Sequence, residues 1–202
     1  MSAVSLVGNK PALRVPSRRR VIRLLGGALL GGFGLLALQG ALTSQLRIGI
    51  DSDSERCFPW TVYLMRETFY PSAIKPGALV RFDPGTRMSI PGTGPVNKGR
   101  QVIKMVAATS GDSVRISPKV VTINAIPLKT VVDRGIGQAL ETDGLNRDVL
   151  AKLGRIASDL ERSFIVPEGH VFVVATAARS FDSRYWGTLP TSAITALATP
   201  IY

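Results

Sequence analysis

The longest apolar run of the chain stands near its N-terminus. Residues 24–42 form 19 positions without a charged side chain, and Gln39 is the only strongly polar residue among them. A helix of that length spans roughly 28 Å, about the thickness of a bilayer's hydrocarbon core. A cleaved secretory signal is the alternative, but its apolar core is only about 7–15 residues long and ends at an A-x-A-like site. Gln39-Gly40-Ala41 matches such a site poorly, so the pattern favours an uncleaved transmembrane anchor.

Beyond residue 56 the apolar positions come in short runs separated by proline and glycine, which is typical of β-strands and turns. These runs predict strands over residues 62–65, 78–82, 102–107, 113–116, 120–123, 170–174 and 194–198. Residues 140–160 differ, because their apolar positions recur every three or four residues and therefore predict a helix. The expected fold class is mainly β, with a partly helical insertion over residues 125–163 behind one N-terminal transmembrane helix.

The net charge of +11 is concentrated at the N-terminus, where residues 1–23 hold six of the 25 basic residues and no acidic one. A basic cluster ahead of an apolar stretch indicates a cytoplasmic tail by the positive-inside rule. The rest of the chain has no basic block interleaved with aromatic residues, so a nucleic-acid partner is not expected. The predicted organisation is a tail over 1–23, an anchor over 24–42 and an extracytoplasmic domain over 43–202.

Few residues are available for metal or disulfide chemistry. The chain has one cysteine and one histidine, and neither a CxxC nor an HExxH motif occurs. An intramolecular disulfide is therefore excluded, and neither a metal site nor a cofactor is expected. His170 follows a Pro-Glu-Gly turn with no second nitrogen ligand nearby in the sequence, which indicates a structural role.

The single cysteine, Cys57, follows a charged run and precedes Phe58 and Pro59. A lone cysteine is often a small buried hydrophobic residue, and that alternative stays open. A charged run and a rigid proline are nevertheless unusual neighbours for a residue that only fills a core. Cys57 is therefore a candidate nucleophile, which requires a base to take the proton from the thiol.

Lys104 lies inside the apolar run Val102-Ile103-Lys104-Met105-Val106. In a strand it shares a face with Val102 and Val106, because alternate residues point the same way. Burial disfavours the charged form of a lysine, and a neutral amine can accept a proton. A lysine at a strand edge that reaches out to water is the alternative reading.

A third polar stretch runs from Arg179 to Gly187. Ser180, Asp182 and Arg184 alternate, so an extended backbone would point them the same way. Asp182 and Arg184 are placed to form an ion pair and Ser180 to form a hydrogen bond nearby. A loop clamp that serves structure alone is the alternative.

These three stretches, in this order behind an N-terminal anchor, resemble the type I signal peptidases, and most closely their conjugative-transfer (TraF-type) branch. Residues 182–187 read Asp-Ser-Arg-Tyr-Trp-Gly, nearly letter for letter the family's last motif. Lys104 with the later Gly111-Asp112 is similar to the lysine motif. Residues 166–172 resemble the segment before the last motif. The resemblance implies a β-rich, membrane-anchored peptidase with a serine nucleophile and a lysine base, a variant of the catalytic triad.

The departure from the family lies at the nucleophile. Cys57-Phe58-Pro59 stands where the branch has Ser-Met-Pro, and Tyr63 keeps the branch's tyrosine spacing. Glu55 occupies the position of a hydroxyl that often assists the oxyanion hole in bacterial relatives. The resemblance therefore implies that the backbone N–H of Cys57 carries more of the oxyanion stabilisation.

Together these features predict a single-pass protein of the bacterial inner membrane, with a cytoplasmic N-terminus and a periplasmic peptidase domain. The expected activity is maturation of a pilin or other exported precursor, with Ser180 orienting Lys104 and the Asp182–Arg184 pair holding the surrounding loop. Cyclisation of the product is one possible outcome, since a thioester favours attack by an amine. The alternatives are a general signal peptidase and a catalytically silent assembly factor, and other transfer-complex proteins are further expected partners.

Overall fold

The structure is a computed structural model that describes residues 46–51, 56–85, 89–90, 94–95 and 101–201. All of them belong to one of the two units into which the chain divides, residues 45–202. The predicted tail over 1–23 and anchor over 24–42 lie outside the described residues. Among the described residues, no helix combines the length and the apolar character needed to cross a membrane.

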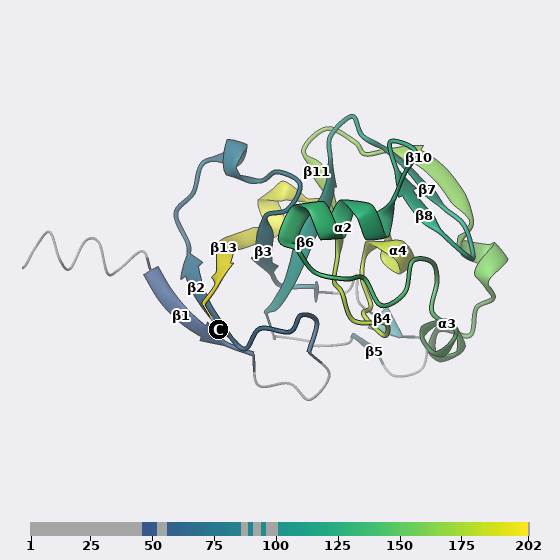
Figure 1. Cartoon of the computed structure of the whole chain (residues 1–202), viewed down its shortest axis with the longest axis horizontal. Helices are drawn as coiled ribbons and strands as arrows, with labels where there is room; N and C mark the ends of the chain where they lie inside the picture. The colour runs from purple at the N-terminus through teal and green to yellow at the C-terminus, as the bar shows by residue number, and fades with distance from the viewer. Residues whose placement is uncertain (1–45, 52–55, 86–88, 91–93, 96–100, 202) are drawn as a thin grey trace, which may run out of the picture. The chain divides into compact units, whose positions relative to one another are not determined.

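A seven-stranded antiparallel sheet forms the centre of the unit, with the strand order β1-β2-β13-β3-β6-β11-β12. Its strands are β1 (Leu46–Ile50), β2 (Val62–Arg66), β3 (Leu79–Phe82), β6 (Val102–Thr109), β11 (His170–Val174), β12 (Leu189–Pro190) and β13 (Ile194–Pro200). All pairs are antiparallel. The strand order is not the sequence order, so segments distant in sequence lie side by side, as β6 and β11 do in Figure 1.

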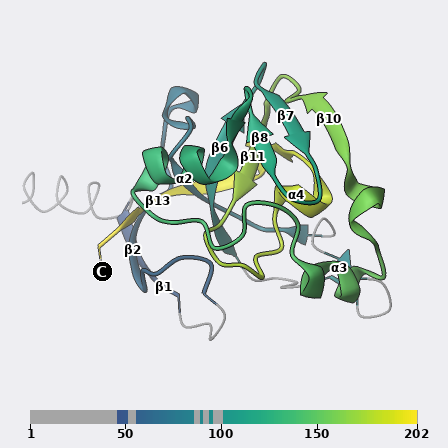
Figure 2. The same ribbon diagram turned by 45° about the vertical axis from the view of Figure 1, so that its right-hand side comes forward.

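A smaller sheet and short helices complete the unit. The four-stranded sheet has the order β10-β7-β8-β9, and its neighbouring strands are seen together in Figure 2. A two-stranded ribbon pairs β4 with β5. The remaining elements are β4 (Ser89–Ile90), β5 (Gly94–Pro95), β7 (Ser113–Ile116), β8 (Val121–Ile123), β9 (Ile126–Pro127), β10 (Arg162–Ile165), α2 (Leu128–Ile136), α3 (Arg147–Leu153) and α4 (Ser183–Trp186).

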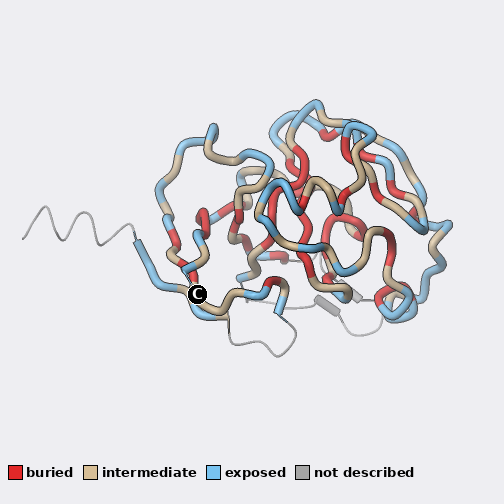
Figure 3. The backbone as a smooth tube through the Cα atoms, viewed as in Figure 1, coloured by how far each residue is buried: buried red, intermediate tan, exposed pale blue. Residues whose placement is uncertain are grey.

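Both faces of the large sheet are covered at its centre. One cluster joins Met105 of β6 with residues of the small sheet, of α2 and of α3, while Val106 packs with Val80 and Val173 on the opposite face. A strand buried on both faces reads as a continuous apolar run rather than an alternating one, which is the pattern of β6. Figure 3 shows the buried stretches gathered along these inner strands. Lys104 is thus a charged residue type within the buried central part of β6.

The β-rich class expected from the sequence is confirmed, and the predicted helix over 140–160 is wrong in extent. Asn146 caps α3 by accepting hydrogen bonds from Asp148 N and Val149 N, and Gly154 ends the helix at φ 62°. A 3-10 turn then follows at Ala157–Leu160. The apolar spacing over 140–160 therefore extended beyond the helix and included Ile156, which is 66% exposed, since local capping decides where a helix begins and ends.

Several elements were missing from the sequence prediction, among them α2, β10 and β1. Helix α2 buries Leu128 and Val132 and lies within the predicted partly helical insertion over 125–163, but outside the helix predicted over 140–160, because adjacent β-branched residues masked its helical period. Strand β10 pairs with β7 and was assigned to no strand. Strand β1 pairs with β2 in a segment where no strand was predicted, and Ile48 and Ile50 on one of its faces are 70% and 73% exposed.

Candidate active site

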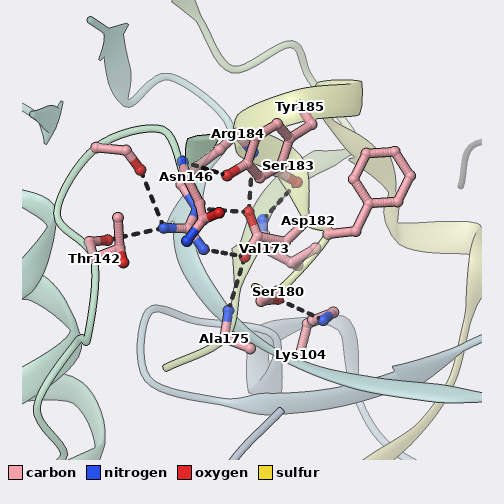
Figure 4. A network of polar contacts seen from close by, with 12 residues as sticks. Lys104, Thr142, Asn146, Val173, Ala175, Ser180, Asp182, Ser183, Arg184 and Tyr185 are labelled. Carbon is pink, nitrogen blue, oxygen red and sulfur yellow. Dashed lines mark hydrogen bonds and ion pairs between the residues drawn. The ribbon is translucent and has the colours of Figure 1, made fainter. Parts of the chain in front are cut away.

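Three side chains from distant parts of the chain meet at the start of β6. Lys104 Nζ donates hydrogen bonds to Cys57 Sγ at 3.0 Å and to Ser180 Oγ at 2.8 Å. Lys104 is 1% exposed and Ser180 is 6% exposed, while Cys57 is partly accessible to solvent. Figure 4 shows Ser180 directed at the Lys104 amine. The structure therefore brings together the three side chains that the sequence analysis proposed as nucleophile, base and orienting hydroxyl.

Strand pairing places Lys104 at this point. Lys104 lies opposite Val80 in the β3–β6 ladder, so its backbone is held in the middle of the large sheet. The alternative of an edge lysine reaching to water is wrong, because β6 is an inner strand and the side chain is buried. A buried amine needs polar partners, and here those partners are the thiol and the hydroxyl.

The backbone of Cys57 is held by a residue that the sequence prediction missed. The Cys57 carbonyl accepts hydrogen bonds from Thr176 N at 3.1 Å, from Thr176 Oγ1 at 3.0 Å and from Ala177 N at 3.4 Å. Phe58, the next residue, is buried and stacks on Trp60 with ring centroids 5.9 Å apart. Thr176 is the only hydroxyl residue within Ala175–Ala178, but a threonine among alanines carries no pattern that would have singled it out.

Tyr63 supports the same turn from β2. Its hydroxyl donates to the carbonyl of Trp60 at 3.2 Å, and the residue is fully buried. Burial raises the pKa of the phenol far above its usual value, and the nearby Asp51 and Cys57 raise it further. The hydroxyl is therefore a neutral donor, which suits it to hold the backbone between Cys57 and β2.

Asp182 and Arg184 form a fully buried ion pair beside the site (Figure 4). Arg184 Nε donates to Asp182 Oδ1 and Nη2 to Asp182 Oδ2, each at 2.9 Å. Nη1 donates to the carbonyls of Thr142 at 2.9 Å and Gly144 at 3.3 Å. Burial alone would lower the pKa of Arg184, but the charge and hydrogen bonds of Asp182 outweigh it and raise the pKa above its ordinary value.

The expected extended backbone over this stretch is wrong, and the reason is local capping. Asp182 accepts from Arg184 N and caps the helical turn α4. Asp182 Oδ2 also accepts from Ala175 N at 3.2 Å, and Ser183 Oγ accepts from Val173 N at 2.9 Å. The ion pair thus ties β11 and the loop after it to α4, as a loop clamp does.

Other polar features lie away from this cluster. His170 Nδ1 contacts the carbonyl of Glu168 at 3.0 Å, which agrees with a structural role. Among the described residues, no group of three or more His, Cys, Asp or Glu is placed to hold a metal ion. A hollow of about 740 Å³ on the small sheet is lined by residues of β7, β8 and β10, and Cys57 and Lys104 are not among them.

Comparison with known proteins decides the family. The family model for signal peptidase, peptidase S26, matches residues 24–202. The chain belongs to this family. It is similar to the conjugal transfer protein TraF of Agrobacterium tumefaciens (strain 15955), with 31% identity over 102 residues. That match covers 50% of this chain and 48% of the relative, so it spans about half the relative's length. A signal peptidase I structure from Enterococcus faecalis V583 matches with TM-score 0.33 and 21% identity, over 62% of this chain and 96% of that one.

The S26 family membership and the TraF relationship agree with the resemblance inferred from the motifs. In this S26 peptidase the Cys57 thiol and the Ser180 hydroxyl each form a hydrogen bond with the Lys104 amine. The Asp182–Arg184 ion pair does not contact these three side chains by a hydrogen bond. Asp182 is linked to them through the loop after β11, where it accepts a hydrogen bond from Ala175 N. The arrangement can pass a proton between Cys57 and Lys104, while the roles assigned to individual residues stay predictions.

Proposed function

We propose that this S26 family member is a membrane-anchored Cys/Lys endopeptidase of a conjugative transfer system that matures a pilin precursor. The contact between Lys104 Nζ and Cys57 Sγ at 3.0 Å carries the proposal. A nucleophile and its base within hydrogen-bond reach, with the base oriented by a third group, is the geometry of nucleophilic catalysis. Ser180 Oγ at 2.8 Å from Lys104 Nζ supplies that third group.

The proposed reaction begins with proton transfer from Cys57 Sγ to Lys104 Nζ. The thiolate attacks the scissile carbonyl carbon, and the resulting oxyanion accepts a hydrogen bond from the Cys57 backbone N–H. As the intermediate collapses, the C–N bond breaks and Lys104 returns the proton to the leaving amine. The precursor's carbonyl group is then held as a thioester on Cys57.

In the second half of the reaction, another nucleophile displaces the Cys57 thiolate from the thioester. Lys104 takes a proton from water or from a substrate amine, which attacks the thioester carbonyl, and the Cys57 thiolate leaves and recovers that proton. Water releases a linear chain with a free carboxylate. An amine at the other end of the same chain forms a peptide bond and closes a ring, whose mass is one water lower than that of the linear product.

Ser180 and the buried ion pair are proposed to support these steps without reacting. Ser180 restrains the Lys104 amine toward Cys57, since Lys104 Nζ contacts both side chains. The Asp182–Arg184 pair holds the loop that carries Ser180, because Asp182 accepts from Ala175 N at the start of that loop. Such outer contacts keep catalytic groups within the narrow range of geometry that reaction needs.

Two comparisons support the choice of substrate. Signal peptidases act on exported precursors, and the similarity to a conjugal transfer protein favours a substrate within a transfer system. A pilin precursor fits both, and other transfer-complex proteins are proposed as partners. The substrate is proposed to lie extended against a strand edge near Cys57, where main-chain hydrogen bonds provide affinity.

Location at the inner membrane is proposed from the sequence, with the peptidase domain in the periplasm. The apolar stretch 24–42 ends only a few residues before β1, whose Leu46, Ile48 and Ile50 are 43%, 70% and 73% exposed. An exposed apolar face on the strand that follows the proposed anchor in the sequence is suited to rest on a lipid surface. Fractionation of cells that express the full chain tests this placement, and recovery in the soluble fraction would contradict it.

The decisive experiment is the intact mass of the candidate pilin from cells that express wild type, Cys57→Ala or Cys57→Ser. Loss of processing in Cys57→Ala is expected, while Cys57→Ser is expected to keep part of it, since serine restores the family's own nucleophile. The wild-type product mass then distinguishes a ring from a cut chain. Unchanged processing in Cys57→Ala would refute the proposal and favour a silent assembly factor. Loss of processing across many exported proteins would indicate a general signal peptidase.

A further inference from the structure

The carbonyl oxygen of Cys57 accepts three hydrogen bonds, although Cys57 lies outside any helix or strand. Thr176 donates to it twice, from its backbone N at 3.1 Å and from its hydroxyl at 3.0 Å, and Ala177 N adds a third contact at 3.4 Å. Thr176 is only 6% exposed and lies 119 positions from Cys57 in the sequence. A carbonyl has two lone pairs, so these contacts leave the peptide group after Cys57 little freedom to rotate.

The loop after β11 holds the nucleophile at one end and the base at the other. Its start is fixed by the hydrogen bond from Ala175 N to Asp182 Oδ2, and its interior by that from Ser180 N to the Ala177 carbonyl at 3.0 Å. From this loop, Thr176 donates a hydrogen bond to the Cys57 carbonyl, and Ser180 accepts one from the amine of Lys104. The distance between thiol and amine therefore depends on one short loop.

We propose that Thr176 is a positioning residue for Cys57, and that its hydroxyl sets the thiol in line with the Lys104 amine. The proposal rests on the proposed function, in which that pair performs the chemistry. The Thr176 hydroxyl donates to the Cys57 carbonyl and not to the thiol, so it acts on the thiol through the backbone of Cys57. Because one hydrogen bond to a neutral carbonyl is replaced by a methyl contact in Thr176→Val, a loss of about three- to tenfold in kcat is expected, with KM unchanged.

The first measurement is the rate at which iodoacetamide alkylates Cys57 as a function of pH in the full-length chain. The chain has a single cysteine, so alkylation reports on this thiol alone. Thr176→Val keeps the β-branched shape and both backbone donors, and it removes only the hydroxyl. The expected result is an altered pH profile and a slower plateau rate, whereas Thr176→Ser is expected to stay within about twofold of wild type.

Thr191 provides a matched control at the far end of the large sheet. It also donates twice to one carbonyl, that of Gly169, from its backbone N at 2.8 Å and from its hydroxyl at 3.0 Å. Thr191→Val therefore removes the same kind of bond without touching the Cys57 turn. Its bond is exposed whereas that of Thr176 is partly buried, so Thr191→Val is expected to lower thermal stability no more than Thr176→Val does, and to leave both kcat and the alkylation profile unchanged.

The outcomes separate positioning from stability. A changed alkylation profile in Thr176→Val alone, together with rescue in Thr176→Ser, supports the proposal. An unchanged profile and kcat, or an equal change in Thr191→Val, overturns it. If Thr176→Val does not fold, Thr176→Ala against Thr176→Ser makes the same comparison. If Cys57→Ala still processes the precursor while Thr176→Val alters alkylation, the positioning role stands and the proposed peptidase function fails.

Discussion

The buried ion pair offers the largest change in stability that the structure predicts. The side chains of Asp182 and Arg184 are both fully buried. In Arg184→Gln the carboxylate of Asp182 loses two hydrogen bonds of 2.9 Å and its counter-charge, at a point that solvent does not reach. The carbonyls of Thr142 and Gly144 lose their donor as well. Removing one partner of a buried pair costs about 3–5 kcal/mol, because an uncompensated charge remains inside. For a domain of this size the melting temperature should fall by about 6–20 °C.

Thermal unfolding followed by circular dichroism measures this loss, and Arg47→Gln is the control. Arg47 forms an ion pair with Glu67 at 3.4 Å, but its side chain is 67% exposed. Exposed pairs contribute at most about 1 kcal/mol, so this variant should melt within about 4 °C of wild type. The contrast tests burial itself, since both substitutions remove an arginine from an ion pair.

A double variant tests whether the cost comes from the unpaired charge. Asp182→Asn with Arg184→Gln leaves no buried charge at this point, so it should be less destabilised than the sum of the two single variants. An Arg184→Gln protein that melts no lower than Arg47→Gln would refute the reasoning. So would strict additivity in the double variant.

Three further predictions follow from single residues. Lys104→Met keeps the buried stem of the side chain but removes the proton acceptor beside Cys57, so the rate of precursor processing should fall by about 10²–10⁴-fold. Intact mass spectrometry over time measures the fraction of precursor processed. Processing near the wild-type rate would exclude Lys104 as the base. Burial would raise the pKa of Asp112, but hydrogen bonds from Thr109 and Asn124 lower it overall. Its stabilising effect is therefore present above the ordinary carboxyl pKa of about 4 and is lost as pH falls through the lower folded-state value; the excess melting temperature of wild type over Asp112→Asn should shrink below about pH 4, and a constant difference down to pH 2 would contradict this. In Gly144→Ala the new Cβ would lie 2.5 Å from the carbonyl oxygen of Pro118, so the backbone must shift and stability should fall by about 1–3 kcal/mol; a melting temperature equal to that of wild type would show that the loop yields freely.

The strands of the large sheet were largely predictable from local sequence. Residues 102–107 and 170–174 were expected as strands and form β6 and β11, because apolar runs bounded by glycine and proline have few other ways to satisfy their backbone groups. The helix over 140–160 was overestimated, since apolar spacing marks buried positions but says little about where caps end a helix. Strand β1 was missed because it lies just after the predicted anchor and its apolar side chains are exposed and not packed in the core.

In the candidate site, the unusual residue types were predictable from the sequence, whereas the contacts between them were not. Cys57, Lys104, Ser180, Asp182 and Arg184 were all selected from the sequence as unusual residue types in their surroundings. Thr176 was not, because a threonine among alanines carries no distinctive pattern, and its role appears only where its hydroxyl meets the Cys57 carbonyl.

By itself, the sequence determined which local segments form strands, which residues are chemically unusual, and which family motifs they match. Backbone preferences and apolar spacing act over a few neighbouring residues, so these properties can be read along the chain. Only the tertiary structure decided that Lys104 lies 3.0 Å from a thiol 47 positions away and 2.8 Å from a hydroxyl 76 positions away. Such meetings depend on the register of several antiparallel strands at once, and a shift of one residue in β6 would turn the lysine to the other face of the sheet.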